Sequence, residues 1–452
     1  MKRLVVVLSL VGVVAALHPA GAAESPAAPA NPVLPVARPD VTGPVTGGLK
    51  GRPFMGLLAV PRGFVQEEYF VSGTARPYVG PAVLAKQSLE GTESLAPLPY
   101  TTRIIVVRPV TRANGTVVVT WNNVTFGHDI NEWSNIGRQV VADRYTYVDA
   151  SVQLASMPGM KAFDPVRYAT VALPGDAYSY DIYSQVAQAL LHGDGLHGTR
   201  PARVLAIGAS QSGFALDQYL SDVQPRYERV YDGFLVAVAN GPDHRVDRPV
   251  IRLLSENEID GTSVSPDGRL YRQWEIAGSA HGNKNDFEYI GATEERDLGV
   301  DLVNPLAGDN GPFGTSDCLM NRFPTWQAYN GALVALDRWV GGAGPPAPQP
   351  RVRVVGGEEV RDPAGNSVGG IRYPAMAVPV AAYNRTGDCV QLDGRTEPFT
   401  GQELRRRYPT HAIYVSAVKR AVAAALRAGV LTANDAAETL AGARRAVVPP
   451  PA

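Results

Sequence analysis

One serine of this chain stands in a turn whose residue types suit nucleophilic catalysis. Ser210 lies in a run of small residues, 208–213, between the apolar segment 204–207 and an amphipathic segment that ends at Val223. This order predicts a strand, a sharp turn and a helix, the arrangement called a nucleophile elbow. A serine hydroxyl is a weak nucleophile at its own pKa, so it needs exposure and a nearby base. The turn would expose Ser210, and the N–H of Gln211 at the helix start would face a developing oxyanion.

The turn departs from the usual spacing of this motif. A nucleophile elbow normally reads G-x-S-x-G, whereas here Ser212 stands in the last place and Gly213 follows it. Serine is the next smallest residue, so we expect the turn to survive. Taking Ser212 as the nucleophile would put Ser210 where the first glycine belongs, and therefore we favour Ser210. The alternative is a glycine-rich turn in another kind of α/β protein.

Among the seven histidines, His281 is the best placed to act as the base. It follows the expected strand 271–276 in a loop of small residues, which leaves the imidazole free to lie over the carboxyl edge of a sheet. Active sites of open α/β sheets lie at that edge. The alternative is an exposed loop histidine without a role. The remaining histidines lie in the leader, in loops or in the C-terminal part: His18, His128, His192, His197, His244 and His411.

The acid of a serine hydrolase of this kind falls between the serine and the histidine in the chain. Three carboxylates follow the expected strand 250–254, namely Glu256, Glu258 and Asp260. Such an acid holds the histidine in one tautomer and stabilises the imidazolium. Glu258, a short turn beyond the strand, is our preferred acid; Glu256 is the close alternative and Asp260 the third. The order serine, acid, histidine is that of α/β hydrolases.

The second oxyanion donor is expected in the loop after the strand 116–121. The candidates are the backbone N–H groups of Asn122, Asn123 and Val124, beside that of Gln211. Losing one such donor typically costs on the order of 10² to 10³ in rate. The alternative is that the two asparagines only form an Asx turn.

Composition and charge limit the classes of protein to which this chain can belong. The 452 residues are 45% hydrophobic and 19% charged, which suits a globular chain with a large core. A formal net charge of -1 provides no broad basic field, so neither nucleic acid nor an anionic membrane is an expected partner. After the N-terminal leader, no segment is apolar and long enough to cross a membrane.

The N-terminus predicts export. Residues 1–23 form a signal peptide, with a basic start, the apolar run 4–17 and a cleavage site near Ala22–Ala23. An uncleaved anchor helix is the alternative. Residues 24–48 are rich in alanine and proline and are expected to be a disordered or extended tether. The mature protein would therefore be periplasmic or extracellular.

The expected export also bears on the state of the two cysteines. Cys318 and Cys389 are the whole cysteine content of the chain, and we expect them to form one disulfide after export. The alternative is two unpaired buried thiols. Two cysteines this far apart do not by themselves make a zinc site.

Apolar strands alternate with helical patterns over residues 49–284, which form the expected core. The pattern predicts an α/β protein with a mainly parallel, doubly wound sheet and an antiparallel N-terminal edge. The dipeptide Asn114–Gly115 is a hairpin signal between the second and third strands. Strands are expected at 64–77, 102–110, 116–121, 145–152, 204–207, 231–239, 250–254 and 271–276, and helices at 130–144, at 178–191 and after the elbow.

Residues 285–452 read as an added C-terminal part. A core helix is expected at 323–341, with Trp326, Tyr329 and Trp339 packed on the sheet; an aromatic substrate platform is the alternative. The rest is expected to be a lid-like extension over the pocket. Residues 405–407 are three arginines, which we interpret as a solvated helix face.

A resemblance to a known family rests on six segments: 121–125, 175–185, 208–213, 274–281, 335–340 and 370–374. They resemble the corresponding segments of the bacterial secreted family of alpha/beta hydrolase domain proteins. The resemblance runs from about residue 51 to about residue 444 and implies an α/β-hydrolase fold with a serine nucleophile and a histidine base. It does not indicate a substrate. Members often carry arginine after the SQSG turn, where this chain has Phe214, so no basic group is available there.

Together these features predict a secreted serine hydrolase that cleaves carboxylic esters through an acyl-enzyme. Ser210, His281 and Glu258 would do the chemistry, and neither a metal nor an organic cofactor is expected. The substrate would be a small ester, a lipid or a decorated polysaccharide. The alternatives are an acyltransferase with the same residues, a non-catalytic binding protein on a hydrolase scaffold and a peptidase acting on small peptides.

Overall fold

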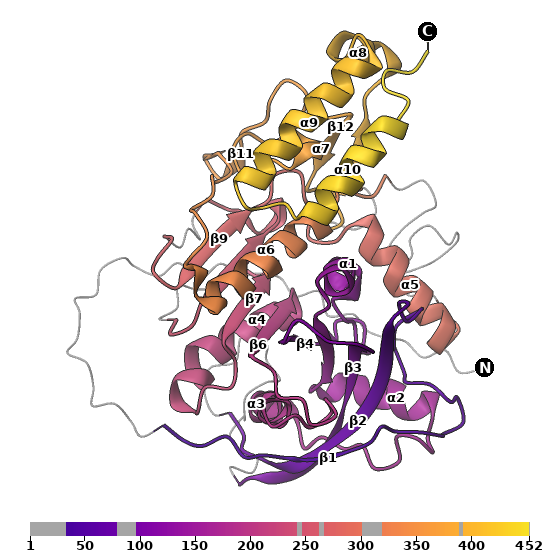
Figure 1. Ribbon diagram of the computed structural model, residues 1–452, viewed down its shortest axis with the longest axis vertical. Helices are drawn as coiled ribbons and strands as arrows, with labels where there is room; N and C mark the ends of the chain where they lie inside the picture. The colour runs from indigo at the N-terminus through magenta and orange to yellow at the C-terminus, as the bar shows by residue number, and fades with distance from the viewer. Residues whose placement is uncertain are drawn as a thin grey trace, which may run out of the picture. The chain divides into compact units, whose positions relative to one another are not determined.

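A nine-stranded sheet forms the centre of the computed structural model, which describes residues 33–78, 96–241, 246–261, 266–300, 319–387 and 392–451. Its strands run in the order β1-β2-β3-β5-β4-β6-β7-β8-β9 (Figure 1). The strands are β1 (Asp40–Thr42), β2 (Phe64–Ala75), β3 (Leu98–Pro109), β4 (Thr116–Trp121), β5 (Thr146–Ser151), β6 (Arg203–Ala209), β7 (Gly233–Ala237), β8 (Val250–Leu254) and β9 (Tyr271–Glu275). Two further pairs, β10 (Val354–Val355) with β11 (Glu358–Glu359) and β12 (Ala381–Asn384) with β13 (Arg395–Pro398), make small separate sheets.

The directions of the strands confirm the predicted sheet. β1 is antiparallel to β2, β2 is antiparallel to β3, and β3 is antiparallel to β5. From β5 through β4, β6, β7 and β8 to β9 every neighbouring pair is parallel. The protein is therefore an α/β protein with a mainly parallel sheet and an antiparallel N-terminal edge.

The hairpin expected at Asn114–Gly115 is wrong. The two residues do form a turn, with Gly115 at a φ of +94°, but the strands on either side of it are not neighbours. β5 lies between them: Val148 of β5 is paired with Val106 of β3 on one side and with Val119 of β4 on the other. The chain thus passes over one strand position between β3 and β4, and after helix α1 (Trp133–Asp143) it returns as β5 to fill that position.

Helices cover both faces of the sheet because the buried strands are apolar on both sides. Ile105, Val118 and Leu205 share one core with α1 and α6, whereas the next residues along the same strands share another with α3 and α4. The helices are α1 (Trp133–Asp143), α2 (Met157–Phe163), α3 (Ser179–Leu191), α4 (Gln211–Gln218), α5 (Lys284–Leu298), α6 (Trp326–Arg338), α7 (Pro374–Ala377), α8 (Gly401–Arg407), α9 (His411–Arg427) and α10 (Ala433–Arg445).

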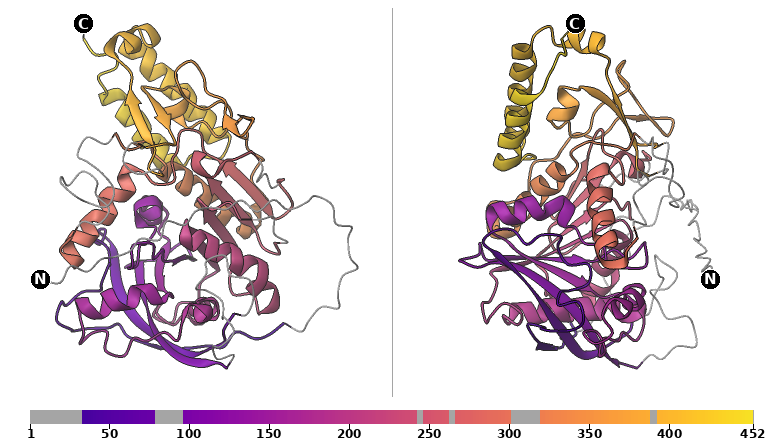
Figure 2. Two further views of the ribbon diagram at one scale, coloured as in Figure 1. Left: turned by 180° about the vertical axis from the view of Figure 1, so that it is seen from behind. Right: turned by 90° about the vertical axis from the view of Figure 1, so that its right-hand side faces the viewer.

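The C-terminal part is joined to the sheet beyond β9. Ile371 makes a parallel bridge with Ile276, and its N–H donates to the carbonyl of Glu275 at 2.7 Å. α6 packs against β7 and β8, and α9 and α10 lie side by side (Figures 1 and 2). The buried Trp339, just after α6, agrees with the core packing expected for this helix. That the C-terminal part moves as a lid stays a prediction.

The described part of the expected tether, residues 33–48, lies along the sheet edge. β1 pairs with β2, Leu34 forms a bridge with Tyr227, and the side chain of Val36 is buried. Backbone pairing and the burial of Val36 therefore hold this segment against the rest of the protein. The signal peptide, residues 24–32, Cys318 and Cys389 all lie outside the described residues, so export and the disulfide stay predictions. Within the described ranges, no helix has the length and hydrophobicity needed to cross a bilayer.

Candidate active site

Ser210 occupies the turn between β6 and α4, and its backbone is strained. Its φ is 56° and its ψ is -121°, outside the regions that residues with a side chain prefer. The N–H of Ser210 donates to the carbonyl of Ala237 in β7 at 3.0 Å, which helps to hold this conformation. The strain places the hydroxyl at the carboxyl end of β6, as a nucleophile elbow requires.

Close approach explains the small residues around Ser210. A Cβ on Gly208 would come within 2.6 Å of the carbonyl oxygen of Ser212, and a Cβ on Gly213 within 2.8 Å of that of Ala237. Ser212 is fully buried, and its Oγ lies 3.0 Å from both the nitrogen and the oxygen of Ala209. Ser212 therefore ties the helix start back to the strand, while the hydroxyl of Ser210 stays available.

The structure brings His281 and Glu258 together with Ser210. Nε2 of His281 lies 2.8 Å from Oγ of Ser210, and Nδ1 lies 2.6 Å from Oε1 of Glu258. The three side chains follow β9, β8 and β6, and the carboxyl ends of these parallel strands meet at one edge of the sheet. Because a carboxylate only accepts, Nδ1 carries the hydrogen and Nε2 is free to accept the serine proton.

Short-range hydrogen bonds fix the acid. The 3-10 turn Glu256–Glu258 begins with a capping box, in which Oε2 of Glu258 accepts from both the N–H and the hydroxyl of Ser255, at 3.0 and 2.6 Å. The intervening Asn257 accepts the backbone N–H of His281 at 2.9 Å. One turn thus holds both the side chain and the backbone of the histidine.

The alternative acids do not meet His281. Glu256, which is fully buried, accepts the N–H of Gly278 at 2.6 Å and pairs with Arg361 at 2.9 Å. It therefore holds the start of the loop that carries His281. Asp260 is exposed at the end of the same segment. Side chains of a tight turn point in different directions, so the preferred acid, Glu258, is the one of the three that contacts the imidazole.

The charges around His281 favour its protonated form. Burial alone would lower the pKa of His281, but the charge and the hydrogen bond of Glu258 outweigh it, and the pKa is raised above 6.5. Asp393 and Asp286 add smaller contributions in the same direction. Burial raises the pKa of Asp393 to about 7 and that of Asp286 to about 6. Three carboxyl groups therefore surround one imidazole.

Of the four backbone N–H groups expected as oxyanion donors, those of Gln211 and Val124 remain candidates. Gln211 is the first residue of α4, so its N–H has no acceptor within the helix. The N–H of Asn123 instead donates to the carbonyl of Ile130 at 2.9 Å, so Asn123 is wrong as a backbone donor. Its side chain accepts the N–H of Thr125 at 2.8 Å, which is the Asx turn considered as the alternative.

Val124 has an N–H at the site, but this group already has an acceptor. It donates to Oε1 of the Gln211 side chain at 3.1 Å. The N–H of Asn122 donates to the carbonyl of Ala150, in the neighbouring strand β5, at 3.4 Å. Val124 is therefore the remaining candidate in this loop for a donor to an oxyanion.

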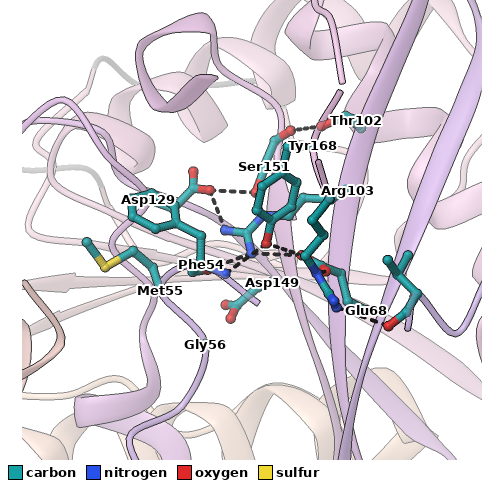
Figure 3. A network of polar contacts seen from close by, with 12 residues as sticks. Phe54, Met55, Gly56, Glu68, Thr102, Arg103, Asp129, Asp149, Ser151 and Tyr168 are labelled. Carbon is teal, nitrogen blue, oxygen red and sulfur yellow. Dashed lines mark hydrogen bonds and ion pairs between the residues drawn. The ribbon is translucent and has the colours of Figure 1, made fainter. Parts of the chain in front are cut away.

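A second buried polar cluster lies beside the loop after β4. In this cluster, which we call the Arg103 network, Arg103 contacts Glu68, Asp129 and Ser151, and Tyr168 donates to Glu68 at 2.8 Å (Figure 3). The guanidinium lies 2.8 Å from Asp129 and 3.3 Å from Glu68. Asp129 belongs to the same loop as Val124, so the network fixes the segment that carries the possible oxyanion donor.

Some site residues were missing from the predictions. Asn257 stood between the two glutamates considered as acids, and the order of the chain gave no sign that it would bind the His281 backbone. Asp393 comes from the C-terminal part, far from Ser210 in the chain. Gln153, whose Oε1 accepts a hydrogen bond from the side-chain amide of Gln211 at 3.0 Å, follows β5 at the carboxyl edge of the sheet, and that position was its only signal. Among the described residues, no group of three His, Cys, Asp or Glu side chains is arranged to hold a metal ion.

Comparison with known proteins gives a family and distant structural likenesses. A family model described as "Alpha/beta hydrolase domain" matches residues 41–441. Solved structures similar to this chain include a poly(3-hydroxybutyrate) depolymerase from Bordetella parapertussis (12% identity, 44% of this chain and 86% of the other, TM-score 0.26). A glucuronoyl esterase from Teredinibacter turnerae is 11% identical over 49% of this chain and 62% of its own, with a TM-score of 0.27. No curated protein matches the sequence.

Proposed function

The chain belongs to the alpha/beta hydrolase domain family, and from this premise we propose that it is a serine hydrolase of carboxylic esters. The observation that carries the proposal is the hydrogen-bonded series from Ser210 through His281 to Glu258, with Ser210 in a strained turn. A serine, a base and an acid in this relation activate a hydroxyl for attack on a carbonyl.

The mechanism uses only side chains and backbone groups of the protein. His281 takes the proton of Ser210 as its Oγ attacks the ester carbonyl, and the N–H groups of Gln211 and Val124 bind the oxyanion. His281 then gives the proton to the leaving alcohol, which leaves an acyl-enzyme. Water attacks the acyl-enzyme with His281 as base, so that the acid is released and Ser210 regains its proton.

Export belongs to the same proposal. The basic start, the short apolar run and the Ala20–Ala22 site of the first 23 residues support secretion of the mature enzyme to the periplasm or the medium. Its substrate would then be an ester outside the cytoplasm, small or polymeric.

The test is covalent labelling with a fluorophosphonate, followed by peptide mapping. We expect label on Ser210 in the wild type and in the matched control Ser212→Ala, and no label in Ser210→Ala. Turnover of an ester panel should fall by about 10⁶ in Ser210→Ala, as when the nucleophile of a comparable site is removed. Unchanged turnover in a folded Ser210→Ala protein would contradict the proposal. Product analysis with an added alcohol separates hydrolysis from acyl transfer.

A further inference from the structure

The side-chain amide of Gln211 is held by two groups at the active-site edge of the sheet. Its Oε1 accepts the N–H of Val124 at 3.1 Å, and its Nε2 donates to Oε1 of Gln153 at 3.0 Å. Gln153 is only 2% exposed, and its Oε1 also accepts the indole N–H of Trp121 at 3.0 Å. These contacts join the carboxyl ends of β4, β5 and β6, on the side of Ser210 away from β8 and β9.

Chemistry fixes the orientation of both amides. The indole N–H of Trp121 can only donate, so the atom of Gln153 that meets it is an oxygen. The atom of Gln211 that meets this oxygen must then be the nitrogen of its amide. The oxygen of the Gln211 amide is left facing the backbone N–H of Val124, which again can only donate.

This arrangement has a consequence for the oxyanion. A backbone N–H points in one direction, so any acceptor that it serves must lie along that direction. An oxyanion bound by Val124 therefore takes the place that Oε1 of Gln211 holds in the structure. The same displacement leaves Oε1 of Gln153 without the amide hydrogen that it accepts from Gln211.

We propose that the Val124 N–H and Oε1 of Gln153 form a two-point receptor for the acyl group of the substrate, which the Gln211 carboxamide fills until a substrate binds. The acyl group that fits this receptor carries a hydrogen-bond donor beside its carbonyl, as 2-hydroxyacyl esters do. The substrate carbonyl replaces Oε1 of Gln211, and the substrate hydroxyl replaces its Nε2. This inference rests on the proposed esterase function and names its substrate class.

Burial gives the receptor its selectivity. A simple acyl group would satisfy Val124 but would leave the oxygen of Gln153 with the indole of Trp121 alone. A buried polar atom that loses a partner is costly. For this reason, sites built to bind a substrate hydroxyl reject analogues that lack it far more strongly than apolar pockets reject an extra methylene.

Three ethyl esters of similar size test the selectivity: ethyl glycolate, ethyl methoxyacetate and ethyl acetate. The hydroxyl of glycolate can donate, whereas the ether oxygen of methoxyacetate withdraws electrons similarly but cannot donate. We expect kcat/KM for glycolate to exceed that for methoxyacetate by at least about tenfold. Equal values for these two esters would overturn the proposal, since electron withdrawal would then explain any advantage over acetate.

Two variants assign the effect to its residues. Gln211→Ala keeps the backbone N–H but removes the amide, so kcat/KM should rise for all three esters with the glycolate preference retained. Gln153→Leu should lose that preference. A folded Gln211→Ala protein that is slower on every ester would show that the amide supports the site, and would overturn the proposal. If Gln153→Leu does not fold, the wild-type ratio and Gln211→Ala still decide.

The failure of this inference can be told from failure of the esterase proposal. A fluorophosphonate label on Ser210 together with equal cleavage of the three esters removes only the two-point receptor. A folded wild type that neither takes up the label nor cleaves any ester removes both.

Discussion

The reaction site and the Arg103 network both bury charged groups at the sheet. They differ in the exposure of the central side chain and in the number of groups that contact it. In the network, Arg103 is 1% exposed and its guanidinium contacts a backbone carbonyl, a hydroxyl and two carboxylates. At the site, the side chain of His281 is 20% exposed and is held between one hydroxyl and one carboxylate.

The comparison teaches what distinguishes a reacting group from a structural one. Burial and charge are present in both places, and the network holds the larger number of ionic contacts. The reaction site differs in its partial exposure, in the strained backbone of Ser210 and in a proton that can move along one line of atoms. A buried ion pair is therefore weak evidence of chemistry, whereas a partly exposed base hydrogen-bonded to a strained nucleophile is strong evidence.

Among the tests of this comparison, the largest predicted effect separates the two glutamates of one turn. In Glu258→Gln, the remaining amide oxygen should stay with the two donors of Ser255, so the amide nitrogen would face Nδ1 of His281. The imidazole would then carry its hydrogen on Nε2 and could not accept the proton of Ser210. We expect kcat to fall about 10⁴-fold with little loss of stability, measured by steady-state kinetics and by urea unfolding.

Glu256→Gln is the matched control for that variant. Glu256 pairs with Arg361 and accepts the N–H of Gly278. Loss of its negative charge should therefore lower the free energy of unfolding rather than turnover. The opposite pattern, with kcat lost in Glu256→Gln and kept in Glu258→Gln, would contradict the assignment of the acid.

The next effect concerns the Arg103 network. Arg103→Met leaves the buried Asp129 without a guanidinium partner and leaves Glu68 with that of Arg167 alone. We expect the free energy of unfolding in guanidinium denaturation to fall by about 3–5 kcal/mol. The control is Arg38→Met, which removes an exposed pair with Asp194 and should cost about 0–1 kcal/mol. Equal effects of the two variants would show that the network adds nothing beyond surface pairing.

A smaller effect is expected from a substitution in the turn that carries Ser210. Gly208→Ala places a Cβ within 2.6 Å of the backbone of Ser212, so the elbow must shift, at a cost of about 1–3 kcal/mol. Gly442→Ala in α10 meets no atom within 4 Å and should be neutral or slightly stabilising. Thermal unfolding of both proteins, with fluorophosphonate labelling rates, measures the difference; a neutral Gly208→Ala would be evidence against close packing at the elbow.

The smallest effect is the dependence of the site on pH. Since His281 must be neutral to take a proton and its pKa is raised, kcat/KM should fall about tenfold for each pH unit below that pKa. Asp393→Asn removes a negative charge that raises the pKa of His281, so the midpoint of the pH profile of kcat/KM should move to lower pH. A midpoint that stays in place, or moves upward, would argue against a charge on Asp393 near the imidazole.

Local patterns in the sequence predicted the parts of this molecule that depend on local chemistry. The apolar runs gave the strands, and the small residues around Ser210 gave the elbow. The insertion of β5 between β3 and β4 could not be predicted, because the pairing of distant strands is not encoded in the turn at Asn114. The direction of the Asn123 N–H and the contact of Gln211 with Gln153 depend on segments that meet only after folding, so sequence order gave no sign of them.

The bond from Glu256 to Arg361 also bears on how such genes can recombine. Arg361 and Ser367 belong to the C-terminal part, and both contact the glutamate that holds the histidine loop. A crossover between two family members near residue 284 would join a sheet to C-terminal residues that had not evolved with its turn. We therefore expect functional chimaeras to inherit residues 256–258 and 361–367 from the same parent.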